Sequence, residues 1–246
     1  MDIAFTFGII TDHTRELSVH LPKIIQSIQN LNIPNYEIII VGDQNQLKTK
    51  EYYNDIRVIH FTEKQGWITR QKNLITQYAK YENIVYQHDY IYYDADWYEG
   101  FKTFGDNFDI CMNKIKNNDG VRFRDWVAYP WHHVGYINHP SAKLWKFSGI
   151  ENNECMLPYD ENRLKEYQYI SGSYWMAKKH TMNTFRLNEN LFWEQGEDLE
   201  FSQRVINACN YVMNQFSTVH FAKQKNDALH PIKEDVLKKC IEFISK

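Results

Sequence analysis

Residues 3–10 read IAFTFGII, and this short apolar run decides the fold. A run of this length without alternating polar positions is typical of a strand buried on both faces of a sheet. Apolar residues at helical spacing follow it and predict a helix that stops before Pro34 (Leu21, Ile24, Ile25, Ile28 and Leu31). A second buried strand at 37–41 ends at Gly42-Asp43. We therefore expect the chain to start with a strand–helix–strand unit.

The same alternation continues up to residue 88. Residues 56–61 and 84–87 predict two more strands, and residues 70–78 predict a helix between them. This order predicts an α/β fold whose mostly parallel sheet is flanked by helices. In such sheets, ligands bind outside the carboxyl ends of the strands. We expect the polar residues just past three strands to converge there on one crevice: Thr11-Asp12, Asp43 and His88-Asp89.

The second half of the chain is less regular. Residues 113–167 carry many aromatic residues with little periodicity and predict long loops, in which His132, His133 and His139 are substrate-facing or structural. Strands are expected around 174–177 and 218–221, with a helix starting near residue 197 and a closing helix over 236–244. The sequence shows no repeat and no linker, so we expect a single domain over residues 1–246.

Composition narrows the class of protein. The 28 Lys and Arg residues against 31 Asp and Glu residues give a net charge of −3, which argues against a nucleic-acid partner. The aromatic content of 15% suits both core packing and stacking on sugar rings. The four cysteines are far apart and match no disulfide framework or zinc pattern, as expected in a reducing compartment.

Membrane and targeting signals are not recognised in the sequence. No apolar run approaches the roughly 18 residues of a membrane span, and the start of the chain does not resemble a signal peptide. We expect a cytoplasmic protein without a transmembrane segment. Peripheral contact with a membrane stays open.

An adjacent pair of acids stands out in residues 193–204, WEQGEDLEFSQR. The apolar spacing that follows places Glu197 and Asp198 at or near the N-terminus of a helix. Carboxylates there are favoured by the helix dipole and cap free N–H groups. Capping needs only one acid, however, and two acids behind Gly196 with Trp193 at hand also suit a general base acting on a sugar hydroxyl. Both interpretations remain open at this point.

Residues 66–73, GWITRQKN, place a glycine before a helix that bears two cations and an amide. Helix N–H groups and positive charge suit a diphosphate, but Arg70 and Lys72 are also compatible with solvated positions. The segment lacks the glycine patterns of a P-loop and of a dinucleotide-binding turn. Asp43, at the end of a buried strand, suits either contact with a nucleobase or ribose or an ordinary turn.

Two acidic positions compete for a divalent cation. Asp89 directly follows a strand and is better aimed at the crevice, whereas Asp94 belongs to DADW, which looks like the capped start of a helix. Hard cations use few protein carboxylates because diphosphate oxygens fill the remaining positions. We therefore favour Asp89. His88 and His220 are compatible with metal ligation and also with hydrogen-bonded or core histidines.

Taken in order, these segments resemble the GT-A glycosyltransferases, most closely the family-2 type. The resemblance covers most of the chain: residues 7–28 and 36–43, the Gly66…Arg70…Asn73 helix, which is similar to a G-x-x-x-A-R-N stretch, and the strand at 84–87. Where the family carries a D-x-D metal motif, this chain has His88-Asp89-Tyr90. Residues 170–175, ISGSYW, resemble the small-residue strand entry near the acceptor site, and Glu197-Asp198 matches the family's acidic pair.

The resemblance implies that a sugar moves, with inversion, from a UDP-linked donor to a hydroxyl of a glycan or another acceptor. Residues 1–110 would bind the nucleotide-sugar and residues 111–246 the acceptor. Asp198 is implied as the base, and Glu197 as a residue that positions the acceptor. The implied donor-binding residues are Thr11, Asp43, Gly66, Arg70, Lys72, Asn73 and Asp89.

The resemblance also implies the acceptor site and the metal site. The implied acceptor-binding residues are Gly172, Tyr174, Trp175 and Trp193, of which the three aromatic residues also suit core packing. The implied ligands of Mn²⁺ or Mg²⁺ are Asp89, His88 and His220.

Three observations argue against other functions. A sugar-1-phosphate nucleotidyltransferase needs a glycine-rich, basic loop, whereas residues 7–15 hold one glycine. A noncatalytic carbohydrate-binding protein would not need the acid pair. The Q-x-x-R-W pattern of processive synthases is absent from the sequence, which favours transfer of one sugar per encounter.

Overall fold

A computed structural model of the chain describes residues 2–11, 20–43, 56–128, 155–225, 229 and 231–245. Asp12 and the loop histidines His132, His133 and His139 lie outside these ranges, as do residues 129–154 of the predicted loop region.

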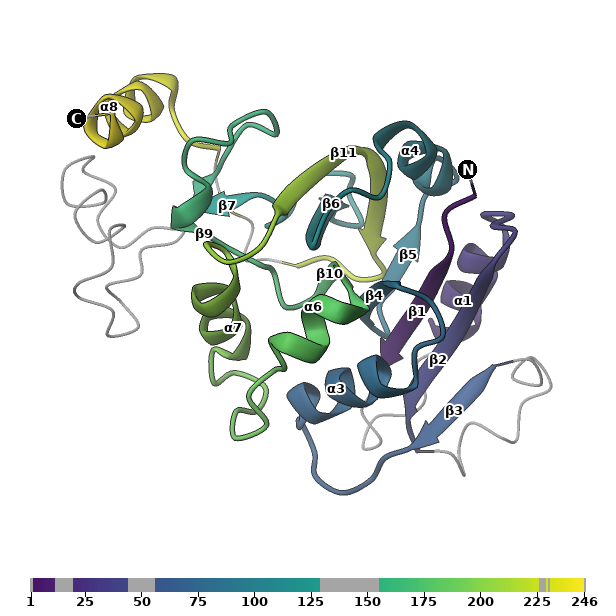
Figure 1. The fold of residues 1–246 in the computed structure, drawn as a ribbon. Coiled ribbons are helices and arrows are strands. Elements are labelled where there is room, and N and C mark those ends of the chain that lie inside the picture. The colour runs from purple at the N-terminus through teal and green to yellow at the C-terminus, as the bar shows by residue number, and fades with distance from the viewer. Residues whose placement is uncertain are drawn as a thin grey trace.

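An eight-stranded sheet forms the centre of the molecule (Figure 1). Its strands are β1 (Phe5–Ile10), β2 (Tyr36–Gly42), β3 (Arg57–His60), β4 (Asn83–His88), β5 (Ile91–Tyr93), β6 (Ile110–Lys116), β10 (Tyr174–Lys178) and β11 (Tyr211–Phe221). They lie in the order β3-β2-β1-β4-β10-β6-β11-β5. The first four are parallel, β10 runs antiparallel to both neighbours, β11 is parallel to β6, and β5 is antiparallel to β11. The sheet is therefore mostly parallel, which confirms the predicted fold class.

Helices cover both faces of this sheet. Helix α3 (Ile68–Tyr78) packs on the face to which Gly8 belongs, where Ile75 occupies the space of a missing side chain. A Cβ atom on Gly8 would lie 2.3 Å from Cγ2 of Ile75, so β1 and α3 approach each other more closely than any larger residue allows. Helix α4 (Trp97–Phe104) covers the opposite face, where Trp97 packs edge-on against Phe5.

The strands and helices of the first half follow the predicted order. Helix α1 (Leu21–Gln29) buries the apolar stripe predicted for it, with Leu21, Ile24, Ile25 and Ile28 inside. Helix α7 (Glu197–Val205) begins at the first residue of the acid pair, as predicted. The remaining helices are α6 (Lys179–Thr184), the short 3-10 helix η3 (Lys165–Tyr167) and α8 (Glu234–Ile244).

The prediction of loops throughout residues 113–167 is wrong for part of that range. Strand β6 extends to Lys116, and β7 (Val127–Ala128), β8 (Cys155–Met156) and β9 (Gln168–Tyr169) form a small antiparallel sheet in the order β8-β7-β9. Strand β11 is also longer than predicted and contains an irregularity between Asn214 and Thr218. Buried polar residues interrupt the apolar runs of both long strands, which hides their period.

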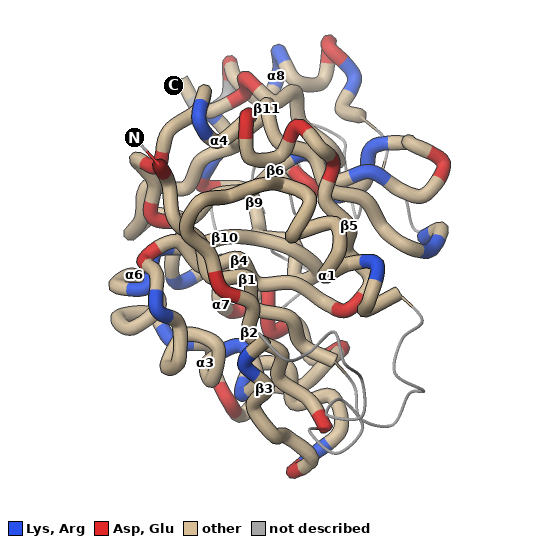
Figure 2. Tube along the Cα trace, turned by 90° about the vertical axis from the view of Figure 1, so that its right-hand side faces the viewer, with Lys and Arg blue, Asp and Glu red and all other residues tan. Residues whose placement is uncertain are grey.

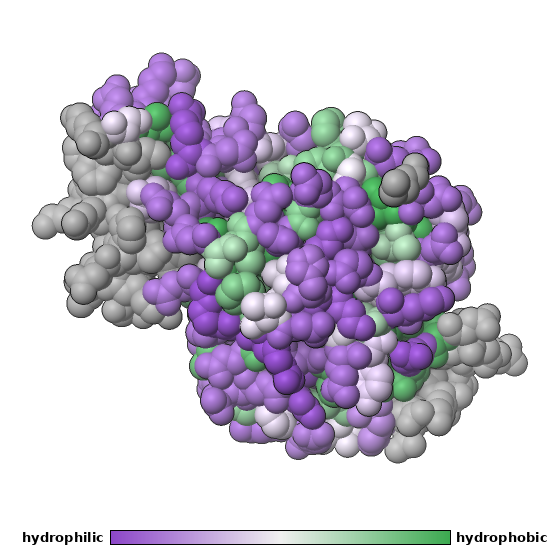
Figure 3. All heavy atoms as spheres, in the orientation of Figure 1, coloured by the Kyte–Doolittle hydropathy of each residue, from purple (hydrophilic) through white to green (hydrophobic). Residues whose placement is uncertain are grey.

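Charge and hydropathy are distributed as the composition suggests. In the view of Figure 2, Lys and Arg are interspersed with Asp and Glu along the described part of the chain. Figure 3 shows a face that is mostly hydrophilic, with small hydrophobic areas among polar ones. None of the helices in the described ranges is long and apolar enough to cross a membrane.

Candidate active site

Two adjoining cavities lie at the carboxyl ends of β1 and β4. The larger cavity has a volume of about 350 Å³ and is lined by Thr11, Gly66, Gln71 and Asp89, among others. The smaller cavity, of about 150 Å³, is lined by Gly172, Glu197 and Asp198 together with aromatic and basic residues. The residues that line both are His88, Tyr90, Trp193 and Lys225. The two cavities are thus two compartments of one crevice.

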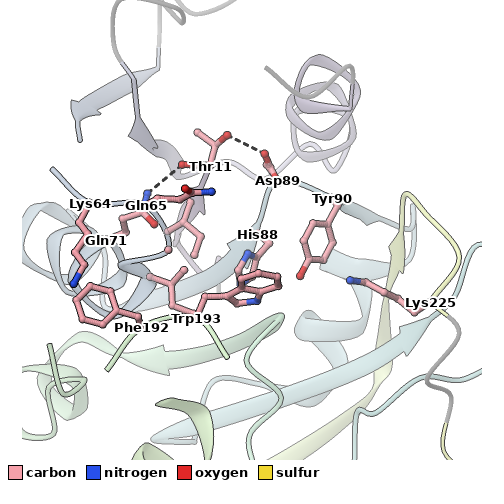
Figure 4. Close-up of a pocket in the computed structure, with 13 residues that line it drawn as sticks. Thr11, Lys64, Gln65, Gln71, His88, Asp89, Tyr90, Phe192, Trp193 and Lys225 are labelled. Carbon is pink, nitrogen blue, oxygen red and sulfur yellow. Dashed lines mark hydrogen bonds between the residues drawn. The ribbon is translucent and has the colours of Figure 1, made fainter. Parts of the chain in front are cut away.

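The ends of three strands are tied together at the rim of the larger cavity (Figure 4). The Thr11 hydroxyl donates a hydrogen bond to Oδ2 of Asp89 at 2.8 Å. Nε2 of Gln71 donates to the carbonyl oxygens of Thr11 and Val41, at 3.1 and 3.3 Å. Thr11, His88 and Asp89 therefore converge on one crevice, as expected. Asp43 directly follows β2, with Oδ1 3.9 Å from Nδ1 of His60, and it is not among the residues that line either cavity.

Helix α3 holds the segment that carries Trp193 against the larger cavity. Asn73 donates from Nδ2 to the Leu187 carbonyl and to Oε1 of Glu189, both at 2.9 Å. Arg70 pairs with the same Glu189 carboxylate at 3.3 Å. The Trp193 N–H donates to the Gly66 carbonyl at 2.8 Å. Arg70 and Asn73 therefore act on the segment and line neither cavity, whereas Gly66 lines the larger one.

Lys72 points away from the larger cavity and lies beneath the acid pair. Only 1% of the residue is exposed, and Nζ donates to the Gly172 carbonyl at 2.8 Å. Burial lowers the pKa of Lys72, while the negative charges of Glu197 and Asp198 oppose that shift. The structure thus brings Lys72 to the carboxylates and not to the place where we expected a diphosphate.

At the start of α7, Glu197 is buried and Asp198 is half-buried. Oδ2 of Asp198 accepts from the Gly172 N–H at 3.1 Å, and Oδ1 accepts from the Leu199 N–H at 2.9 Å. Burial raises the pKa of Asp198, and the Lys72 charge and these N–H donors oppose the rise. Burial also raises the pKa of Glu197, and the charge of Asp198 adds to the effect. Asp198 therefore satisfies one helix N–H and still lines the smaller cavity.

Gly172 allows the acid pair to approach the strand entry. A Cβ atom at this position would lie 2.9 Å from Oδ2 of Asp198 and 3.2 Å from Oε1 of Glu197. Its carbonyl accepts from Lys72 and its N–H donates to Asp198. The peptide groups on either side of Gly172 thus bridge the buried cation of Lys72 and the carboxylate of Asp198.

The three candidate aromatic residues separate into core and site. Tyr174 is fully buried, donates to Oδ1 of Asn113 at 2.6 Å and accepts from Nε1 of Trp97 at 2.9 Å. Trp175 stacks on Tyr86 in the core, with ring centroids 4.4 Å apart. Trp193, in contrast, is 54% exposed and lines both cavities. Trp193 alone of the three lies in the crevice.

The candidate metal ligands also separate. Asp89 and His88 line the larger cavity, and the His88 ring stacks on Tyr90 at 5.2 Å. His220 instead contacts Oδ1 of Asp94 through Nε2, and neither residue lines either of these two cavities. Asp96 occupies the N-cap position of α4 without a capping side-chain bond. Among the residues that the structure describes, no three His, Cys, Asp or Glu side chains gather as a metal site.

Several lining residues were not predicted from the sequence. They include Gln71, Tyr90, Arg124, Phe192 and Lys225. Gln71 lies between the predicted residues Arg70 and Lys72, and Tyr90 directly follows Asp89. Both could therefore have been predicted from their positions in the helix and at the strand end. Arg124 and Lys225 come from segments beyond β6 and β11, where no periodicity indicates an approach to the crevice.

Comparisons with known proteins identify the fold. No protein-family model matches the sequence, and no curated protein sequence matches it. Among solved structures, TarS 1–349 of S. aureus is similar over 99% of this chain and 64% of its own length, with 13% identity and a TM-score of 0.58. The same protein in complex with UDP-GlcNAc is similar over 92% of this chain and 60% of its own, with 14% identity and a TM-score of 0.59.

GalNAc-T7, solved with UDP, GalNAc and Mn²⁺, is similar over 91% of this chain and 44% of its own, with 14% identity and a TM-score of 0.60. The chain thus spans less than two thirds of the length of these structures. At these identities the likeness shows the fold, which is the GT-A fold expected from the sequence.

Proposed function

We propose that this chain transfers one sugar from a UDP-linked donor to a hydroxyl of a glycan or another acceptor, with inversion. The observation that carries the proposal is the crevice itself, in which the cavity lined by the acid pair adjoins the cavity at the strand ends. The GT-A fold supports it. So do the ligands of two similar structures, UDP-GlcNAc in TarS and UDP with GalNAc and Mn²⁺ in GalNAc-T7.

In the proposed reaction Asp198 is the general base. It takes the proton of the acceptor hydroxyl while that oxygen forms a bond to the anomeric carbon. The bond from that carbon to the phosphate oxygen breaks, and its electron pair leaves with the nucleoside diphosphate. A base is most effective when its pKa lies near the working pH, and the raised pKa of Asp198 moves it in that direction. Lys72 keeps the carboxylate ionised, and Glu197 positions the acceptor.

The larger cavity is the proposed donor site. Its volume lies in the range of ordinary ligand pockets, and Thr11, Gly66 and Asp89 line it. Asp43 remains a proposed contact for the nucleobase or ribose. Most of the residues that line the larger cavity come from residues 1–110, and most of those that line the smaller cavity come from residues 111–246. This division supports a donor half and an acceptor half within one domain.

The acceptor would enter the smaller cavity. Trp193 offers an exposed aromatic surface at the wall between the cavities, and such surfaces suit the apolar faces of sugars. The backbone around Gly172 lies beside the base. We leave Tyr174 and Trp175 out of the acceptor site because both are core residues.

The residues of the larger cavity fit a divalent metal held mainly by its substrate. Asp89 offers one carboxylate, held by Thr11, and Mg²⁺ or Mn²⁺ is commonly bound by one or two carboxylates plus phosphate oxygens. His88 lies next to it. When bound there, such a cation withdraws negative charge from the diphosphate. We leave His220 out because it contacts Asp94.

A ligand screen tests the proposed function. We expect UDP-sugars, with Mn²⁺ present, to raise the melting temperature, because a ligand at 100 times its Kd stabilises the folded state by about 2.7 kcal/mol. We also expect UDP release in the presence of a hydroxyl acceptor. Stabilisation by free sugars but by no nucleotide would identify a carbohydrate-binding protein. Pyrophosphate release from UTP and a sugar-1-phosphate would identify a nucleotidyltransferase.

A further inference from the structure

Lys225 lies where the two cavities meet. Among the described residues it is the only lysine or arginine that lines both cavities. Lys64 also lines the larger cavity, but its Nζ lies 3.6 Å from the ring centroid of Phe192. Figure 4 shows Lys64 and Lys225 at opposite ends of that cavity. The shared wall therefore carries one ammonium group of its own.

The fold holds Lys225 in this place through contacts of its backbone and its side chain. Asn117 is fully buried, and its amide group bonds to the backbone of Lys225 in both directions. The Lys225 N–H donates to Oδ1 of Asn117 at 2.9 Å, and Nδ2 of Asn117 donates to the Lys225 carbonyl at 3.0 Å. Nζ lies 4.6 Å from the ring centroid of Tyr90 and 5.6 Å from that of Phe221. These contacts place the ammonium group over aromatic rings, where cations are favoured.

Single displacement places the diphosphate beside this wall. The acceptor oxygen must lie near Asp198 in the smaller cavity, and the nucleotide must lie in the larger one. The leaving group departs from the face of the sugar opposite to the attacking oxygen, so the bond that breaks points from the smaller cavity toward the larger. The phosphate oxygens then lie near the residues that both cavities share.

We propose that Lys225 binds the diphosphate of the donor and stabilises the charge that develops on it during transfer. This inference rests on the proposed function. The ammonium group donates hydrogen bonds to a phosphate oxygen that gains the electron pair of the breaking bond, and no proton is transferred. Charge-assisted hydrogen bonds of this kind are about twice as strong as neutral ones, and they are worth most in a site shielded from water.

A series of ligands that differ only in the number of phosphate groups tests the contact with the diphosphate. Uridine, UMP and UDP are titrated calorimetrically into the wild type and into Lys225→Met, Lys225→Arg and Lys223→Met, all in EDTA. Lys223 is exposed, lies two residues away and lines neither cavity, so its variant removes the same charge from the same segment. The turnover number with a UDP-sugar is then measured for each protein.

UDP should bind more tightly than uridine, and we expect this ratio of affinities to be about tenfold smaller in Lys225→Met than in the wild type. The affinity for uridine itself should be unchanged. The turnover number of Lys225→Met should also fall by about tenfold or more, while Lys225→Arg restores most of both and Lys223→Met matches the wild type. A Lys225→Met protein with the full gain from uridine to UDP would overturn the inference, as would an equal loss for uridine. A wild type that binds none of the three ligands, either in EDTA or after Mn²⁺ is added in excess, would instead contradict the UDP-linked donor on which the inference rests.

Discussion

At the scale of single residues, Lys72 is the residue that controls the ionisation of the proposed base. Its buried ammonium group donates to the Gly172 carbonyl and lies close enough to Glu197 and Asp198 for their charges to raise its pKa. A buried carboxylate without a nearby cation holds its proton more tightly, because burial disfavours the charged form. Lys72 therefore lowers a pKa that burial has raised.

Replacing Lys72 by methionine should shift the pH dependence of turnover. The base must be ionised, so activity rises as pH passes upward through its pKa. Loss of the cation raises that pKa, and the acidic limb of the kcat profile should move to higher pH by about one unit or more. Lys72→Arg, which keeps the charge, should leave the limb near its original position. An unchanged limb in Lys72→Met would show that Lys72 does not act on the base.

Single residues also show where sequence interpretation succeeds and where it stops. Asp89 and Thr11 were predicted because a residue that follows a buried parallel strand must lie at the ligand-binding edge. Lys72 and Arg70 lie two positions apart on a helix, and such positions do not face the same way. Pattern alone could not tell which cation turns toward the crevice. The contacts show that Lys72 turns to the acid pair and Arg70 to Glu189.

At the scale of elements, the contact between β1 and α3 fixes the crevice. Gly8 lets the helix approach the strand, and the same helix carries Gln71, which ties the strand ends together. The apolar runs and helical spacing that predict these elements are local properties. They could therefore be identified without knowing the tertiary structure.

A double-mutant cycle tests this packing. Gly8→Ala places a methyl group within the space of Ile75 and should destabilise the protein by about 1–3 kcal/mol. Ile75→Ala alone should cost about 2–5 kcal/mol because it leaves a cavity. The double variant should be more stable than the sum of the two effects, since the new methyl group enters the vacated space. Urea unfolding measures all three free energies, and strict additivity would contradict the contact.

Strand β6 and the first part of β11 could not be predicted in the same way. Asn113 is buried inside β6 because it accepts from the Tyr174 hydroxyl, and Asn214 is buried in β11 beside Ser217, to which it donates at 2.9 Å. In a sequence, polar residues of this kind indicate a loop and not a buried strand. Asn113 bonds to Tyr174, far along the chain, and Ser217 in turn donates to the distant Trp97 carbonyl, so only the tertiary structure explains this burial.

At the scale of the whole molecule, two halves of unequal regularity meet at one crevice. The first half supplies strand ends and the helix that ties them, and the second supplies the acid pair and Trp193. The chain covers only part of the length of TarS and GalNAc-T7. The expected cytoplasmic location and the hydroxyl acceptor stay predictions.

The central claim is that Asp198 is the base of a sugar transfer. The most direct measurement compares Asp198→Asn with the wild type in single-turnover transfer and in binding of the UDP-sugar. Glu200→Gln is a matched control, because Glu200 lies on the same helix, pairs with Arg204 and lines neither cavity. We predict that Asp198→Asn binds the donor with its Kd within about threefold of the wild type while its rate of transfer falls by at least about a hundredfold, and that Glu200→Gln retains both. Transfer by Asp198→Asn at the wild-type rate would contradict the account.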